Sequence, residues 1–235
     1  MAKTSSSPGT WLSRAIKIVV VALLVPLAIG LLQGVLGQLD AVSVPRGTAR
    51  TWVTWGFMTY VWIHLLLARP EQLFQASRTL FSVLAAWLFG GQVASTEGRS
   101  EGKGKRGGAG KDGGSPLVAF SPYVIPISVL LVCAVGWLLG RWLDHAALDA
   151  PVAFLIGLAT SFHWLMTADA LQQQRSRWHV ETYLLAIVLV FIVSLLLGGA
   201  GLMLPLPEFS YGQAVAGGFA QAHALYATLI QRLFL

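Results

Sequence analysis

The sequence predicts an all-α, multi-pass membrane protein with five or six transmembrane helices. Of its 235 residues, 55% are hydrophobic and only 11% are charged, whereas soluble domains average ~25% charged residues. The apolar residues also gather in runs that are long enough to cross a hydrocarbon core of ~30 Å as helices. Helices are expected because a chain in lipid must satisfy its backbone hydrogen bonds internally.

Six apolar runs divide the chain, at 15–37, 51–68, 73–90, 122–143, 151–168 and 181–204. A polar, basic tail (1–14) precedes them, and residues 15–50 hold a first transmembrane helix and its loop. Residues 51–204 form the predicted membrane core, in which Pro151 begins a helix, a position where proline is tolerated. The final segment, 205–235, is either an interfacial helix or a weak additional span.

The net charge of +6 comes from basic residues that flank the apolar runs. This placement suits anionic lipid headgroups better than nucleic acid, so we expect membrane lipids as partners and no nucleic acid. The single cysteine, Cys133, excludes an intramolecular disulfide and a cysteine-based zinc site.

The long non-apolar stretch 92–116 is rich in glycine and reads as a flexible, solvated loop. Lys3, Arg14 and Lys17 favour a cytoplasmic N-terminus. Six full crossings would then place this loop, with its five basic residues, on the outside, against the positive-inside tendency. The run 73–90 is the most polar of the six, so it is the best candidate for an incomplete crossing.

A polar stripe marks the run 73–90. Its members stand at positions i, i+3, i+4 and i+7, and therefore share one helical face: Gln75, Arg78, Thr79 and Ser82. A charge at the centre of a membrane helix costs about 2.5–3.5 kcal/mol, so we expect Arg78 to face a polar cavity, a carboxylate or water. The alternative is a helix–helix contact from which the arginine reaches the interface.

Several stretches of the chain occur in an order that resembles site-2-protease-type intramembrane zinc metalloproteases, and specifically a small bacterial multi-pass branch. These stretches are Tyr60, Arg69-Pro70, Leu73-Phe74, 85–93, 117–126, 161–167 and 172–174. The resemblance implies a site-2-protease-like core, with a Gly-rich loop, in a bacterial cytoplasmic (inner) membrane. It also implies an HExxH zinc motif on the helix 73–90 and a third ligand, an aspartate, from a later helix.

The chain departs from this family at the residues that perform the chemistry. HExxH works because two neutral imidazoles hold Zn²⁺ while the glutamate activates water. Arg78 and Ser82 stand at the two histidine positions, and Thr79 stands at the glutamate position. The region 174–178, which corresponds to the third ligand, contains no acid. A guanidinium has no lone pair for a metal. We therefore expect no zinc, no catalytic residue and a pseudoprotease that binds or regulates a partner, with a transmembrane helix of another protein as the candidate.

Other side chains are candidate neighbours of this cavity: His163, Thr167 and Asp169. His163 matches a histidine of the resembling family, and Asp169 is a candidate counter-charge for Arg78. A substitute metal site from His64, His163 and Asp169 would require tertiary convergence, since His163 and Asp169 do not share a helical face.

Two rival functions stay open: an active membrane zinc metalloprotease with an unorthodox site, and a small transporter or channel subunit. The first lacks a ligand set, and the second lacks the internal repeat typical of transporters. One packing prediction is independent of function. Gly30 and Gly34 form a GxxxG pair, which favours a close contact between two membrane helices.

Overall fold

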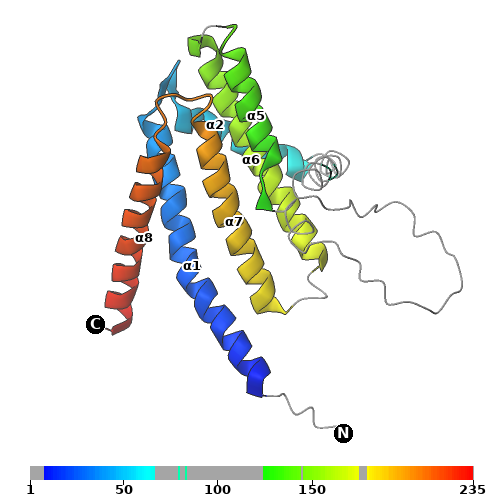
Figure 1. Cartoon of the computed structure of the whole chain (residues 1–235), viewed down its shortest axis with the longest axis vertical. Helices are drawn as coiled ribbons and strands as arrows, with labels where there is room; N and C mark the ends of the chain where they lie inside the picture. The colour runs from blue at the N-terminus through cyan, green and yellow to red at the C-terminus, as the bar shows by residue number, and fades with distance from the viewer. Residues whose placement is uncertain are drawn as a thin grey trace, which may run out of the picture.

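The computed structural model describes residues 8–66, 79, 83, 124–143, 145–174 and 179–234. These residues are mostly helical (Figure 1). The elements are α1 (Pro8–Ala41), β1 (Ser43–Val44), β2 (Gly47–Thr48), α2 (Ala49–Leu66), α5 (Ile127–Leu139), α6 (His145–Gln174), α7 (Val180–Leu202) and α8 (Tyr211–Phe234).

Three helices of the described part are long and apolar enough to cross a membrane: Trp11–Ala41 in α1, Ala147–Gln172 in α6 and Val180–Leu202 in α7. These three helices confirm the prediction of a mostly helical membrane protein with several spans. α5 is apolar but shorter, and the total of five or six spans stays a prediction.

The helices alternate in direction between two ends of the bundle. α1 and α7 run in parallel, and α8 returns along α1, so both chain termini lie at one end, the termini end (Figure 1). The other end, the hairpin end, carries the β1–β2 hairpin that joins α1 to α2. α2 runs beside α6 toward the termini end, whereas α5 runs away from it. The connection 67–123, which contains the Gly-rich stretch, therefore joins a helix directed toward the termini end to a helix directed away from it.

Two of the helices extend further than their apolar runs. α6 begins at His145, so Pro151 lies inside the helix and not at its start as predicted. A proline inside a helix removes one backbone hydrogen bond, but its φ angle is one that a helix accepts. α1 likewise continues through Pro26. The segment 205–235 forms α8, which lies along α1 for most of its length.

Small residues let α8 approach α1 at backbone distance. A Cβ atom added at Gly30 would lie 2.5 Å from the carbonyl oxygen of Gly218 and 2.6 Å from the amide nitrogen of Ala222. One added at Gly34 would lie 2.5 Å from the amide nitrogen of Gly218 and would also collide with Ala214. The predicted close contact of Gly30 and Gly34 is confirmed, and its partner is the small-residue face of α8.

A second glycine crossing joins α2 to α6. A Cβ atom at Gly56 would collide with the carbonyl group of Phe154, and one at Gly157 would collide with the carbonyl group of Val53. Each glycine therefore faces the backbone of the other helix. Membrane helices depend on such contacts because lipid provides little hydrophobic force to press them together.

Polar contacts at the termini end hold α1 to α7. The Arg14 guanidinium lies 3.4 Å from the Glu181 carboxylate, and the Lys17 ammonium donates to the Thr182 hydroxyl at 2.9 Å. These contacts fix the register in which the apolar residues Ala28 and Leu31 of α1 meet Ile192 and Leu195 of α7.

We predict that Gly157→Val strongly destabilises the protein, because the added carbons meet backbone atoms of α2 that have no room to yield. Overpacking costs about 1–3 kcal/mol even where neighbouring side chains adjust. The measurement is the melting temperature of the purified protein in detergent. Gly37→Val is the matched control, since a Cβ there meets nothing within 4 Å. Equal melting temperatures for the two variants would contradict this account of the α2–α6 crossing.

Candidate functional site

Most of the predicted polar stripe falls outside the described residues. Gln75, Arg78 and Ser82 are not described, nor is the predicted pairing of Arg78 with Asp169. Thr79, which is described, is helical and exposed. Thr79 stands at the position of the glutamate, and its hydroxyl is a much weaker base than the carboxylate that activates water in HExxH enzymes.

His163 and Thr167 lie on one face of α6 and are almost fully buried, at 4% and 2% exposure. His163 Nε2 and Thr167 Oγ1 have no hydrogen-bond partner among the described residues. Two buried polar atoms on one helical face are costly in an apolar surrounding. The two side chains thus share one buried face of α6, and Asp169 does not join them. None of the three lines the cavity described below, so their predicted role as cavity neighbours stays a prediction.

Asp169 lies instead at the α2–α6 contact, where its Oδ2 is 3.6 Å from His64 Nε2. Tyr60 is one turn before His64 on α2; its ring contacts the His64 ring at a centroid distance of 6.0 Å and the Phe162 ring at 5.5 Å. Tyr60 is buried, and its hydroxyl has no hydrogen-bond partner in the described part of the chain. Sequence reasoning used Tyr60 only as part of the resemblance and did not place it beside His64.

The substitute metal site is not assembled within the part of the chain that the structure describes. His64 and Asp169 meet, but no group of three His, Cys, Asp or Glu side chains in that part is arranged to hold an ion. His163 stays on a different face of α6, as its helical spacing from Asp169 predicts.

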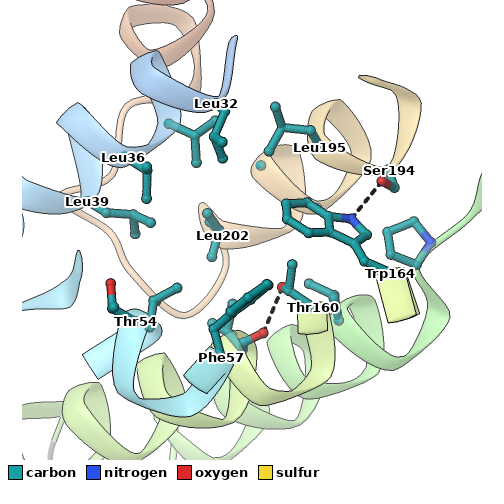
Figure 2. Close-up of a pocket in the computed structure, with 17 residues that line it drawn as sticks. Leu32, Leu36, Leu39, Thr54, Phe57, Thr160, Trp164, Ser194, Leu195 and Leu202 are labelled. Carbon is teal, nitrogen blue, oxygen red and sulfur yellow. Dashed lines mark hydrogen bonds between the residues drawn. The ribbon is translucent and has the colours of Figure 1, made fainter. Parts of the chain in front are cut away.

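A cavity of about 230 Å³ lies between α1, α2, α5, α6 and α7 (Figure 2). Its wall is almost entirely apolar. The lining residues are Leu32, Val35, Leu36, Leu39, Val53, Thr54, Phe57, Pro126, Val129, Ile156, Thr160, Trp164, Ser194, Leu195, Gly198, Gly199 and Leu202. Figure 2 shows the leucines of α1 facing Trp164 and Phe57 across the space.

Each polar side chain of this wall has a partner inside the protein. Trp164 Nε1 donates to Ser194 Oγ at 3.0 Å, and the Ser194 hydroxyl donates to the Phe191 carbonyl oxygen at 3.0 Å. The hydroxyls of Thr54 and Thr160 donate to carbonyl oxygens one turn earlier, at 2.8 and 2.7 Å. The wall therefore offers few free hydrogen-bonding groups, and it favours an apolar occupant over water or a polar ligand.

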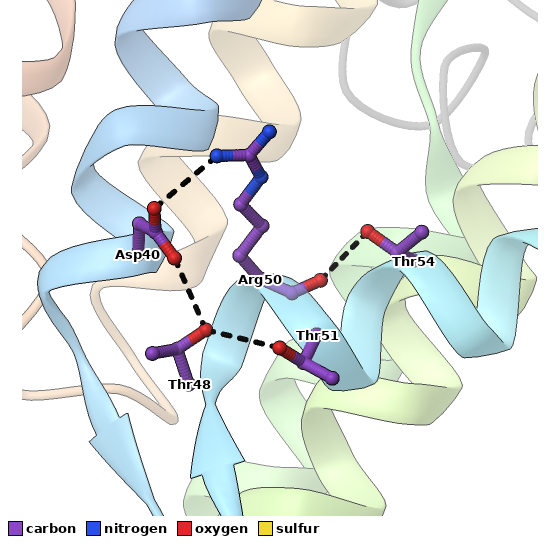
Figure 3. A network of polar contacts seen from close by, with 5 residues as sticks. All are labelled: Asp40, Thr48, Arg50, Thr51 and Thr54. Carbon is purple, nitrogen blue, oxygen red and sulfur yellow. Dashed lines mark hydrogen bonds and ion pairs between the residues drawn. The ribbon is translucent and has the colours of Figure 1, made fainter.

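A polar network joins the end of α1 to the start of α2 at the hairpin end of the bundle (Figure 3). The Arg50 guanidinium lies 3.2 Å from Asp40 Oδ2, and the Thr48 hydroxyl donates to Asp40 Oδ1 at 3.2 Å. Leu39, which lines the cavity, precedes Asp40 in the sequence, and Thr54, which also lines it, stands one turn after Arg50. The charged network is therefore a near neighbour of the apolar cavity wall.

Comparison of the chain with protein families, with curated proteins and with solved structures finds no match. The resemblance to intramembrane metalloproteases therefore rests on the sequence pattern, and the family assignment stays a prediction.

We predict that Tyr60→Phe raises the stability of the protein. Within the described residues the Tyr60 hydroxyl is buried without a hydrogen-bond partner, and an unsatisfied buried polar group costs about 1–3 kcal/mol. The measurement is again the melting temperature in detergent. Thr59→Val is a suitable control, because the Thr59 hydroxyl is exposed and already donates to the Trp55 carbonyl oxygen. A fall in stability with Tyr60→Phe would show that the hydroxyl has a partner that matters.

Proposed function

We propose that this chain is a non-catalytic integral membrane protein whose helix bundle binds an apolar ligand chain in the cavity between α1, α2, α5, α6 and α7. The observation that carries the proposal is that the polar side chains of the cavity wall already have hydrogen-bond partners. The hydroxyls of Thr54 and Thr160 and the indole of Trp164 all donate hydrogen bonds to other groups of the protein. The remaining surface is aliphatic and aromatic.

The volume of the cavity supports the same conclusion. An apolar protein cavity of about 150 Å³ stays dry and takes up a small hydrocarbon, and this one is larger. The cavity also lies between several helices of a bundle that is embedded in lipid, where apolar chains surround the protein. In a bilayer, the abundant ligand with these properties is the acyl chain of a lipid.

The absence of peptidase activity is the second part of the proposal. A working site of the metalloprotease type needs neutral metal ligands and a base that activates water. At the corresponding positions this chain has Arg78, Thr79 and Ser82. In this proposal the sequence resembles that of a protease, but the interior of the bundle binds an apolar chain.

The orientation of the protein in the membrane follows from the distribution of its basic residues. At the hairpin end lie Arg46, Arg50 and Arg141, out of 16 lysines and arginines. Arg14, Lys17 and Arg232 lie at the termini end. Lys3 belongs to the N-terminal tail that leads into α1, and Arg175 and Arg177 belong to the short connection between α6 and α7. Basic residues concentrate on the cytoplasmic side, so we place the termini end in the cytoplasm, as the N-terminal tail predicts.

Gly198→Leu tests the binding cavity. A Cβ at Gly198 has as its nearest neighbour a methyl group of Val129 at 3.8 Å, so a leucine fills the cavity without striking backbone. We expect purified Gly198→Leu to bind about tenfold less palmitate than the parent chain, counted as adducts by native mass spectrometry. Gly37→Leu, outside the cavity, is expected to bind as the parent does. Unchanged palmitate binding by Gly198→Leu would refute the proposed cavity.

Restoring the motif tests the pseudoprotease assignment. The variant Arg78→His, Thr79→Glu, Ser82→His, Ser176→Asp replaces the missing base and all three ligands at the positions that the resemblance gives. We expect it to retain about one zinc per chain by metal analysis, whereas the parent retains none. Zinc in the parent, with chelator-sensitive cleavage of a membrane peptide, would overturn the non-catalytic assignment. Failure of the restored variant to bind zinc would count against the resemblance.

A further inference from the structure

The charged pair at the hairpin end, which we call the mouth, lies beside the cavity lining. Asp40 follows the lining residue Leu39 on α1, and Arg50 stands one turn before the lining residue Thr54 on α2 (Figure 3). The two side chains meet at 3.2 Å and are both about half exposed, at 53% and 47%. Two half-exposed charged groups thus lie close to one part of the apolar cavity wall.

The hairpin segment 40–50 contains one acid and two arginines. Asp40 carries one negative charge, whereas Arg50 and Arg46, at the tip of the same hairpin, carry two positive charges. Arg50 contacts Asp40 through a single guanidinium nitrogen, and within the described residues its other N–H groups have no acceptor. A guanidinium with free N–H groups at a membrane interface is well suited to bind a phosphate, because it donates two parallel hydrogen bonds to the oxygens.

We propose that the occupant of the cavity is a phospholipid, with one acyl chain between the helices and its phosphate held by Arg50 at the hairpin end. This inference rests on the proposed function and adds the headgroup to it. The hairpin geometry supports the role. Arg46 adopts a left-handed backbone with φ of 67° and stands at the exposed tip, and Trp52 Nε1 donates to the Pro45 carbonyl oxygen, which fixes the turn against α2.

Two probes with the same acyl chains separate the headgroup from the chain. Phosphatidylglycerol carries the phosphate, and diacylglycerol lacks it. We expect the full-length protein to retain phosphatidylglycerol at least tenfold better than diacylglycerol, counted as adducts by native mass spectrometry. Millimolar inorganic phosphate is expected not to displace the lipid. Displacement by inorganic phosphate would instead assign the mouth to a free anion and overturn the phospholipid.

Two variants at the mouth are expected to act in opposite directions. Arg50→Gln removes the donor, and we expect about tenfold less phosphatidylglycerol with unchanged binding of diacylglycerol, which has no anionic group. Asp40→Asn removes the carboxylate that competes for Arg50, so we expect equal or greater retention. If the ion pair were merely structural, both variants would lower lipid retention and melting temperature together, and this result would overturn the proposal.

Arg141→Gln is the matched control, because Arg141 also lies at the hairpin end but stacks on Trp137 at 4.1 Å, outside the cavity wall. Equal phosphatidylglycerol binding by Arg50→Gln and Arg141→Gln would refute the headgroup site. In that case, loss of palmitate in Gly198→Leu would still uphold the proposed cavity. Retention of palmitate by Gly198→Leu would refute the cavity, whatever the mouth variants show.

Discussion

The close approach of helix backbones at glycine is the constraint on which the rest of this structure depends. Gly56 and Gly157 let α2 and α6 cross at backbone contact, and Gly30 and Gly34 do the same for α1 against α8. In lipid, association depends on van der Waals contact and on polar groups, because the solvent is itself apolar. A helix pair that meets over its backbone gains many such contacts, and it holds its crossing angle since no side chain separates the two helices.

These two tight pairs also explain why a cavity exists. Each pair is closely packed internally, whereas the space between α1 and α2 is only bordered by side chains from both helices, such as Leu36 and Phe57. Pro126 and Val129, at the start of α5, border this space from one side, and α7 contributes Gly198 where a larger residue would fill it. The void is thus the region that the backbone contacts leave unpacked.

The sequence predicted the class of the fold and part of its packing. Run length and low charge identify α1, α6 and α7, because hydrocarbon thickness sets the length of a spanning helix. The GxxxG spacing predicted the contact of Gly30 and Gly34. Gly56 and Gly157 were missed, since each is a single glycine in its own run and no spacing pattern marks it. α8 was ambiguous for a related reason: its alanines and glycines lower its hydropathy but form the surface that meets α1.

The candidate site was less predictable than the fold. His163 and Thr167 share a helical face, which spacing alone reveals, but the meeting of His64 with Asp169 depends on how two distant helices cross. The cavity has contributions from five helices, and its polar residues, Thr54, Thr160 and Ser194, resemble ordinary isolated hydroxyls in apolar runs. The role of the stripe around Arg78 stays a prediction, because only Thr79 of that stripe belongs to the described residues.

The pairing of α1 with α8 has a consequence for biosynthesis. α1 leaves the ribosome well before α8, yet among the described residues the glycine face of α1 finds its partner on α8. Until α8 has been made, this face stays open to lipid or to the insertion machinery. A nascent chain that stops before Tyr211 would therefore expose the unpaired surface to membrane quality control.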